Sequence, residues 1–169
     1  VLAVGVATHF AEETDGLADA LCEAGISALD GLKTEAGASF TDHIPEIDAC
    51  FAKQSVEEIV SCLQAGSDWA QGQAAGLKKK SPLTLKNAHR QLHEGGQCKD
   101  FRENMRMEYR IASRLVLTKS FHEGVRAVLI DKDNKPDWTP GSLEEVRPVI
   151  LNTFFESLGE DELKFIGEK

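Results

Sequence analysis

The stretch that decides the expected fold is FHEGVRAVLIDKD, residues 121–133. Ser120 precedes it, and Glu123 follows three residues later, which is the spacing of a capping box at the start of a helix. The pattern therefore predicts a helix that begins at Ser120 and ends in the charged residues 131–133. The apolar positions expected on its buried edge are Phe121, Val125, Val128 and Leu129.

Prolines dominate the next segment. Pro136 and Pro140 flank Trp138 and exclude a continuous helix, so we expect an extended segment whose indole lies against the body of the protein. A last helix is predicted from Ser142 onwards, with a kink or a restart at Pro148, because an interior proline removes a backbone hydrogen bond. Its apolar positions are Leu143, Val146, Ile150 and Phe154.

Two more helices have clear start signals. Ser55 and Glu58 form a capping box. Ser81 is an N-cap followed by Pro82 at the first helical position, and Gly95 marks the end of that helix. The expected buried positions are Val56, Ile59, Val60 and Leu63 in the first helix, and Leu85, Ala88 and Leu92 in the second.

The remaining segments complete a mainly α inventory. A helix over residues 99–117 is expected to be the longest, a short amphipathic helix covers residues 17–24, and residues 1–11 are expected to form a turn and one short strand. Residues 25–43 are rich in glycine and are expected to be a loop or an insertion. The longest helix carries its apolar stripe at Phe101, Met105, Ala112 and Leu115, with Tyr109 nearby. One short strand is too few to form a sheet. If the chain is part of an α/β protein, its helices would therefore pack on a sheet formed by other residues.

Composition excludes two classes of partner. The formal net charge of -9 disfavours nucleic acid, which requires clustered lysine and arginine, and the basic run at residues 78–80 is short. No apolar stretch approaches the roughly 20 residues that cross a bilayer, so no membrane partner is expected. The 169 residues, 41% of them hydrophobic, fit one globular domain.

The cysteines carry no recognisable motif. None of the four has the two-residue spacing of zinc ribbons or redox motifs. We interpret Cys22, Cys50, Cys62 and Cys98 as buried or unreactive thiols in a reducing compartment. The sequence opens at Val1 without a signal-like or Arg-rich leader, which we interpret as a fragment or a processed chain.

Signals for catalysis are scarce. Neither the glycine-rich nucleotide-binding loops nor the G-x-S-x-G turn of serine hydrolases occurs. His89 and His93 share a helix face, but no glutamate lies between them to act as the base of a zinc hydrolase. We therefore expect neither a metal site nor a bound cofactor.

Several separated motifs, in order, resemble the 3-hydroxyisobutyryl-CoA hydrolases of the crotonase superfamily. The strongest is the run at residues 121–133 with the P-x-W-x-P that follows it. The others are G-V-A-T-H-F at 5–10, V-E-E-I at 56–59, S-P-L-T-L-K at 81–86, R-Q-L-H-E-G at 90–95 and M-E-Y-R-I-A-S at 107–113. The resemblance covers nearly all of residues 1–169. It is strongest over 81–140 and weakest over 25–43.

The resemblance implies a crotonase-like α/β fold of which this chain is the carboxyl-terminal helical region. It implies hydrolysis of a 3-hydroxyacyl-CoA thioester in valine breakdown, in mitochondria. In that family, backbone N–H donors hold the oxyanion and acidic side chains activate water. These groups lie ahead of the segment that matches Val1, so no catalytic residue is assigned here and the chain alone is expected to be inactive. The acyl-CoA would bind through the missing core, and contact with a crotonase core or self-association is possible.

The same resemblance singles out Arg126 and Lys132 as the cations nearest to the phosphates of coenzyme A, because related trimeric hydratases use a lysine near this point. The alternative for both is a surface ion pair. Val128 departs from those hydratases, which tend to carry a phenylalanine near the adenine. Two other functions stay open: a non-catalytic helical interaction module, as in crotonase relatives recruited into larger assemblies, and the tail of an enoyl-CoA hydratase or isomerase.

Overall fold

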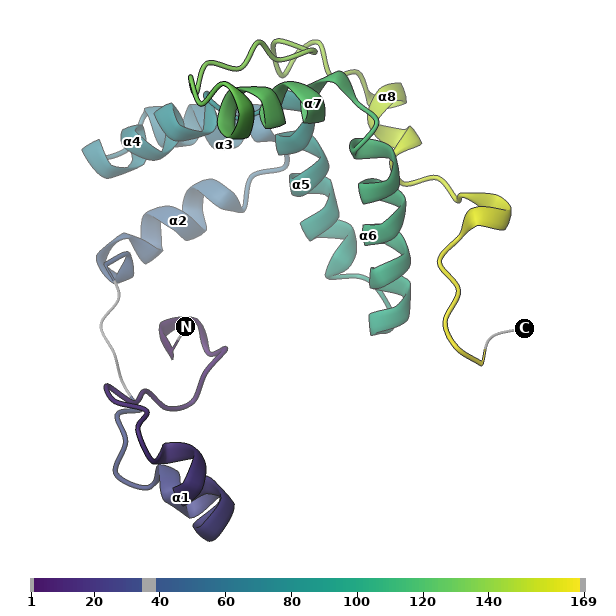
Figure 1. The fold of residues 1–169 in the computed structure, drawn as a ribbon. Coiled ribbons are helices and arrows are strands. Elements are labelled where there is room, and N and C mark those ends of the chain that lie inside the picture. The colour runs from purple at the N-terminus through teal and green to yellow at the C-terminus, as the bar shows by residue number, and fades with distance from the viewer. Residues whose placement is uncertain (1, 35–38, 168–169) are drawn as a thin grey trace. The chain divides into compact units, whose positions relative to one another are not determined.

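A computed structural model describes residues 2–34 and 39–167 (Figure 1). The chain divides into two compact units, Val1–Asp48 and Ala49–Lys169. The first unit is small and mostly exposed. Its elements are η1 (Leu2–Val4), α1 (Leu17–Ala24), η2 (Gly25–Leu29), η3 (Thr41–His43) and the first part of α2 (Ile44–Phe51), inside which the division falls.

The amino-terminal strand predicted for residues 1–11 is wrong for the residues that are described. The 3-10 turn η1 stands there, followed by an isolated antiparallel bridge in which Phe10 N donates to Lys33 O at 2.8 Å. A strand needs a partner along its length, and here the partner segment meets it at a single point. The helix predicted at 17–24 is confirmed as α1. The loop predicted for 25–43 contains the short turns η2 and η3, and residues 35–38 of that prediction lie outside the described part.

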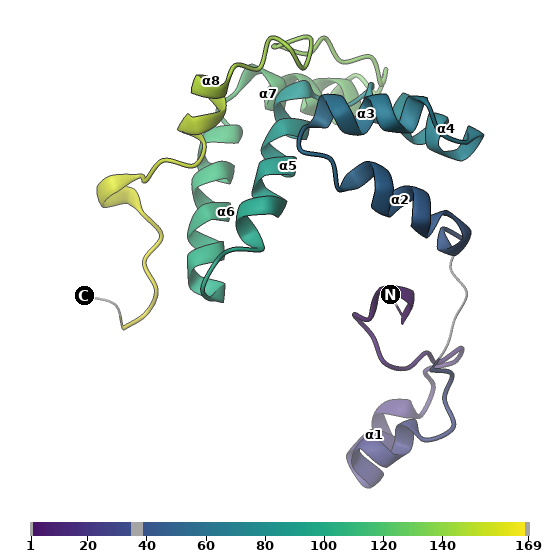
Figure 2. The same cartoon turned by 180° about the vertical axis from the view of Figure 1, so that it is seen from behind.

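The second unit is a set of helices. Figures 1 and 2 show α5 and α6 side by side, joined by a short connection. This agrees with the predicted end of the first of these helices at Gly95. Its elements are α3 (Val56–Gln64), α4 (Asp68–Leu77), α5 (Pro82–Gly95), α6 (Phe101–Leu115), α7 (Lys119–Val125), the π-helical turn η4 (Arg126–Ile130), α8 (Pro148–Thr153) and η5 (Gly159–Asp161). Because residues 2–34 and 39–167 contain no named strand, the mainly α prediction is confirmed for them. No helix among these residues has the length and apolarity to span a membrane.

Two helix starts follow the predicted chemistry. Ser55 Oγ accepts from Glu58 N at 3.2 Å, and the Glu58 carboxylate accepts from Gln54 N at 3.0 Å, so both side chains satisfy free N–H groups. Ser81 Oγ accepts from Thr84 N at 3.3 Å. The start predicted at Ser142 for the last helix is wrong, because residues 142–147 form turns and α8 begins at Pro148, where a proline is tolerated in the first turn.

The capping box predicted at Ser120 is wrong. Thr118 caps α7, and its Oγ1 accepts from Phe121 N at 3.1 Å. Ser120 is buried, and its hydroxyl donates to Thr139 O at 2.8 Å in the proline-flanked segment. A threonine two residues upstream competes for the same role, and spacing alone does not decide between them.

Buried side chains form two clusters in the second unit. The first joins the end of α2 to α3 and α4 and consists of Cys50, Ile59, Leu63, Ala70 and Ala74. The second joins α5 and α6 to the segment around α8 and consists of Leu83, Met107, Ile111, Val146 and Phe154.

In three helices the buried residues differ from the predicted apolar stripe, although Leu115 of α6 does pack against the second cluster. In α5, Leu83 is buried, whereas the predicted Leu92 is 80% exposed. In α6, Met107 and Ile111 are buried and Phe101 lies outside. In α7 and the π-helical turn after it, Ala127 is buried, and the predicted edge residues Phe121, Val128 and Leu129 are exposed. These helices carry apolar side chains on two faces, so periodicity alone does not show which face this chain covers.

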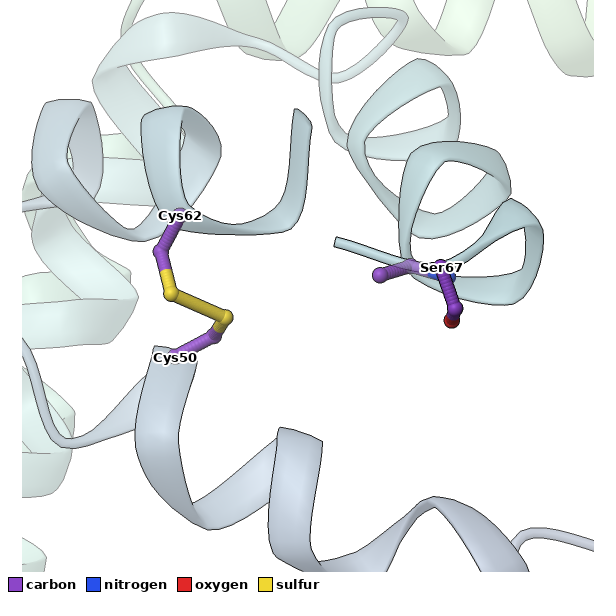
Figure 3. The surroundings of a disulfide bond; sticks show 4 residues. Cys50, Cys62 and Ser67 are labelled. Carbon is purple, nitrogen blue, oxygen red and sulfur yellow. A yellow bond between two sulfur atoms is a disulfide. The ribbon is translucent and has the colours of Figure 1, made fainter. Parts of the chain in front are cut away.

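A disulfide joins α2 to α3, which corrects the prediction of unpaired thiols for Cys50 and Cys62 (Figure 3). The two residues are 12 apart in sequence, but the turn between the helices brings their Cα atoms to 5.4 Å, inside the range that a disulfide requires. Cys22 and Cys98 are free, the first exposed and the second half-buried. Burial, with help from the nearby Glu103, Glu94 and Asp100, raises the pKa of the Cys98 thiol.

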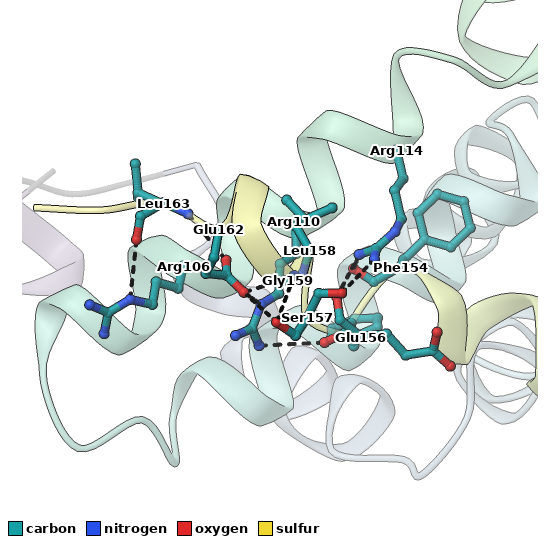
Figure 4. Close-up of polar contacts among 11 residues, drawn as sticks. Arg106, Arg110, Arg114, Phe154, Glu156, Ser157, Leu158, Gly159, Glu162 and Leu163 are labelled. Carbon is teal, nitrogen blue, oxygen red and sulfur yellow. Dashed lines mark hydrogen bonds and ion pairs between the residues drawn. The ribbon is translucent and has the colours of Figure 1, made fainter.

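The carboxyl-terminal segment is attached to α6 by a row of arginines one turn apart (Figure 4). Arg106 Nε donates to Leu163 O at 3.3 Å, and Arg110 Nε to the Glu162 carboxylate at 2.7 Å. Arg114 donates to the carbonyls of Glu156 at 2.7 Å and Ser157 at 3.2 Å. These bonds satisfy carbonyl groups in a segment that has little regular secondary structure.

Candidate functional site

A groove of about 810 Å³ lies beside α5 in the second unit. Its walls come from α3, α5, the end of α4 and the segment that follows Cys50. The side chains lining it are mainly apolar: Phe51, Val56, Ile59, Leu77, Leu85, Ala88 and Leu92. The stripe predicted as the core of α5 therefore lines this groove. An apolar groove with a few polar groups at its edge is suited to holding an apolar chain or surface.

The two histidines on α5 lie at the rim of the groove and each has a separate partner. His89 Nε2 lies 3.2 Å from Lys53 O, and His93 Nε2 lies 2.9 Å from the Gln97 side-chain nitrogen. Within residues 2–34 and 39–167, no three His, Cys, Asp or Glu side chains gather as a metal site would require. The rim histidines thus hold the loop and the helix end in place.

The second candidate region is the loop after α7, organised by Arg126. Its guanidinium donates to both oxygens of Glu123 at 2.7 and 2.9 Å, to Asp131 at 2.6 Å and to Asp133 at 2.8 Å. It also donates to Lys135 O at 3.1 Å. One planar cation with several N–H donors can satisfy all of these acceptors, which a lysine could not do.

This arrangement changes the acidity of its members. Hydrogen bonds from Arg126 and from the Asp137 N–H lower the pKa of Glu123 to about 2. The same guanidinium, together with the Lys135 N–H, lowers the pKa of Asp133. Bonds to Glu123, Asp133 and Asp131 raise the pKa of Arg126. Glu123, Asp133 and Arg126 are therefore ionised at neutral pH.

Lys132 lies exposed between two of these carboxylates. Its φ is 56°, a left-handed conformation that non-glycine residues seldom adopt, and Asn134 has φ 53°. The structure thus separates the two cations singled out from the sequence: Arg126 lies in the ion-pair network and Lys132 at the surface of the loop. Sequence reasoning missed the partners of Arg126, although acids three residues before it and five and seven after it were a usable signal.

Trp138 fastens this loop to the helices, as the sequence predicted. Its indole N–H donates to Lys79 O, just past α4, at 3.1 Å. A methyl group on Gly124 would meet the indole at 3.3 Å, so the ring lies directly against α7. The extended segment is thus held against α7 and against the residues that follow α4.

Comparison with known proteins assigns the family. The sequence profile described as enoyl-CoA hydratase/isomerase matches residues 1–155. The chain is 41% identical to a human 3-hydroxyisobutyryl-CoA hydrolase over 98% of its own length and 47% of the human protein. The chain belongs to the enoyl-CoA hydratase/isomerase family. A mouse 3-hydroxyisobutyryl-CoA hydrolase is 46% identical over 75% of the chain and 33% of the mouse protein. The chain thus spans half or less of the length of these relatives.

Solved structures agree on the fold of this family member. The structure of a carnitinyl-CoA dehydratase from Mycobacterium thermoresistibile matches with a TM-score of 0.86, over 96% of this chain and 48% of the other, at 24% identity. An enoyl-CoA hydratase from Rhodobacter sphaeroides matches with a TM-score of 0.73, over 89% of this chain and 45% of the other, at 30% identity. The fold of this chain thus corresponds to about half of each of these enzymes.

Proposed function

We propose that this chain acts as the carboxyl-terminal region of a 3-hydroxyisobutyryl-CoA hydrolase, an enzyme that cleaves a 3-hydroxyacyl-CoA thioester in valine breakdown. The observation that carries the proposal is the 41% identity to the human hydrolase along 98% of the chain. The human, bovine and chicken relatives are named as mitochondrial, and we propose that location for the whole protein.

In this proposal the chain shapes the enzyme and does not perform the chemistry by itself. Thioester hydrolysis needs donors for the oxyanion and a base that activates water. Two acids of the second unit, Glu123 and Glu162, are held by arginines and have lowered pKa values, which makes them weak bases. Their role is to fasten the loop and the tail.

Lys132 is the proposed contact for the phosphates of coenzyme A, and Arg126 is the proposed second cation. The loop supports different roles for the two. Asp131 and Asp133, the residues on either side of Lys132, both pair with the Arg126 guanidinium, so their carboxylates are directed to Arg126 and the exposed Lys132 ammonium faces solvent. Arg126 would therefore act mainly by keeping this loop in shape.

The test compares the full natural protein with the isolated 169-residue chain. Release of the coenzyme A thiol from 3-hydroxyisobutyryl-CoA is followed with a thiol-reactive dye. We expect turnover by the full protein, none above the uncatalysed rate by the chain, and less turnover with a straight-chain acyl-CoA. Hydrolysis by the isolated chain at an enzymic rate would overturn the proposal.

One alternative has its own support. The 30% identity to the Rhodobacter sphaeroides enoyl-CoA hydratase favours a hydratase as the parent. A hydratase adds water to a double bond and leaves the thioester intact, so it consumes enoyl-CoA without releasing thiol. Measuring both products on the full protein separates the two reactions.

A further inference from the structure

The disulfide between Cys50 and Cys62 has no part in the proposed reaction. Within α2, all of whose residues are described, Cys50 is the one buried residue, with 2% of its surface exposed. It is also the member that α2 supplies to the cluster formed with α3 and α4. The last turn of α2, which belongs to the second unit, is therefore tied to that cluster through this cross-linked side chain.

The cross-link lies where it can influence the groove. Phe51 and Lys53, which follow Cys50 directly, line the groove beside α5. Apart from the disulfide and its own turn bond from Lys53 N to Cys50 O at 3.4 Å, this segment is joined to α5 by the contact between Lys53 O and His89 at 3.2 Å and to α3 by the bond from Gln54 N to Glu58 at 3.0 Å. Fixing Cys50 thus fixes one wall of the groove.

The two sulfurs differ in their exposure to solvent. Cys62 is half-buried and lines an open depression of about 530 Å³ together with Ser61 and Ala65. Cys50, bonded to Cys62 as Figure 3 shows, is buried within the cluster. A small thiol can therefore approach the sulfur of Cys62 from solvent, while the sulfur of Cys50 is protected.

We propose that the Cys50–Cys62 pair is a thiol–disulfide switch that sets the mobility of the groove wall at residues 50–54. A glutathione thiolate attacks Cys62 Sγ, the bond between the two cysteines breaks, and Cys50 leaves as a thiolate that takes up a proton. A second glutathione thiolate releases Cys62, which is protonated in turn. Two electrons and two protons reach the protein, and two glutathiones become one glutathione disulfide.

Reduction loosens the wall and leaves the fold in place. A reduced Cys50 is a small apolar side chain that can stay in the cluster. The segment after it loses its cross-link and keeps its two exposed hydrogen bonds to α3 and α5, so it opens more often. The second cluster, which involves Met107 and Ile111 of α6, contains no part of the switch.

The experiment uses the full natural protein equilibrated in buffers of glutathione and glutathione disulfide. Free thiols are trapped by alkylation, and mass spectrometry reports each cysteine. We expect Cys50 and Cys62 to become alkylated together as one two-electron transition, and Cys22 to be alkylated in every buffer. Hydrogen exchange should then show amides 50–54 exchanging roughly tenfold faster or more after reduction, with α6 unchanged.

Variants separate the switch from a general loss of stability. Cys50→Ala with Cys62→Ala should exchange like the reduced protein in every buffer, and the matched pair Cys22→Ser with Cys98→Ser should respond like the natural protein. Alkylation of Cys50 or Cys62 in the oxidised protein would overturn the proposal. So would reduction that leaves residues 50–54 unchanged, or that accelerates α6 equally.

Discussion

Arg110 of α6 and Glu162 of the carboxyl-terminal segment are 52 residues apart in sequence and are joined by a hydrogen bond of 2.7 Å. The Glu162 side chain is 15% exposed, and its carboxylate also accepts from Ser157 Oγ and from Leu158 N. Burial pushes the pKa of Glu162 up, but the hydrogen bonds from Arg110, Ser157 and Leu158 together hold it below its usual value. This carboxylate is the anionic centre of the contact between the segment and α6 (Figure 4).

Replacing Arg110 should free that segment. Arg110→Met keeps an apolar stem but leaves Glu162 half-buried without its cation, so we expect a loss of about 1 kcal/mol in its docking to α6. Limited proteolysis and hydrogen exchange over residues 155–163 measure the effect. Arg147→Met, at the exposed start of α8, is the matched control. Equal protection in the two variants would contradict the proposed anchoring role.

The sequence was sufficient where a local signal decides the structure. Ser55 and Ser81 have caps that depend on neighbours three residues away, and both were predicted correctly. It was insufficient where distant segments decide. Which face of α5 is buried depends on α6 and the segment around α8. Which cysteine bonds to Cys50 depends on the turn between α2 and α3. Arg126 was identified as an important cation, but its partners depend on the turn made by residues 131–135.

Acid should weaken the loop after α7. The pKa of Glu123 falls from its ordinary 4.5 to about 2 in the folded chain, chiefly through its bonds to Arg126. The unfolded chain therefore binds more protons between these values. The contribution of this carboxylate to stability is fully present above about pH 4.5 and is lost as the pH falls toward 2.

Urea denaturation at a series of pH values tests this directly. The stability difference between the natural protein and Glu123→Gln should be constant above about pH 4.5 and should shrink steadily toward pH 2. Glu156→Gln, an exposed residue of the carboxyl-terminal segment, provides the comparison. A difference that stays constant down to pH 2 would show that Glu123 titrates normally.

The contact between Gly124 and Trp138 predicts that Gly→Ala substitutions in α4 and α7 have different effects on stability. Gly72 lies inside α4 with open space around it, so Gly72→Ala should stabilise the protein by about 0.5–1 kcal/mol through helix propensity. Gly124→Ala has the same gain within α7, but its methyl would lie 3.3 Å from the indole. We expect it to be about 1 kcal/mol less favourable than Gly72→Ala.

A second substitution shows whether the indole is responsible. Trp138→Phe removes the ring atoms nearest to Gly124. In that background Gly124→Ala should increase the free energy of unfolding by about as much as Gly72→Ala does in the natural protein. Chemical denaturation of the natural protein, Gly124→Ala, Trp138→Phe and the double variant gives the coupling energy as a double-mutant cycle. Zero coupling between positions 124 and 138 would contradict the packing described for this loop.

The exposed position of Lys132 leads to a kinetic prediction for the whole enzyme, and it rests on the proposed function. Because Asp131 and Asp133 pair with Arg126 and Lys132 faces solvent, removal of the Lys132 charge should weaken substrate binding without altering the reacting groups. Lys132→Ala should raise KM for the acyl-CoA about three- to tenfold and leave kcat unchanged. Lys135→Ala, three residues further along the same loop, is the matched control, and raised salt should narrow the gap between Lys132→Ala and the natural protein. If Lys132→Ala and Lys135→Ala give the same KM as the natural enzyme, the loop does not contact coenzyme A through this lysine.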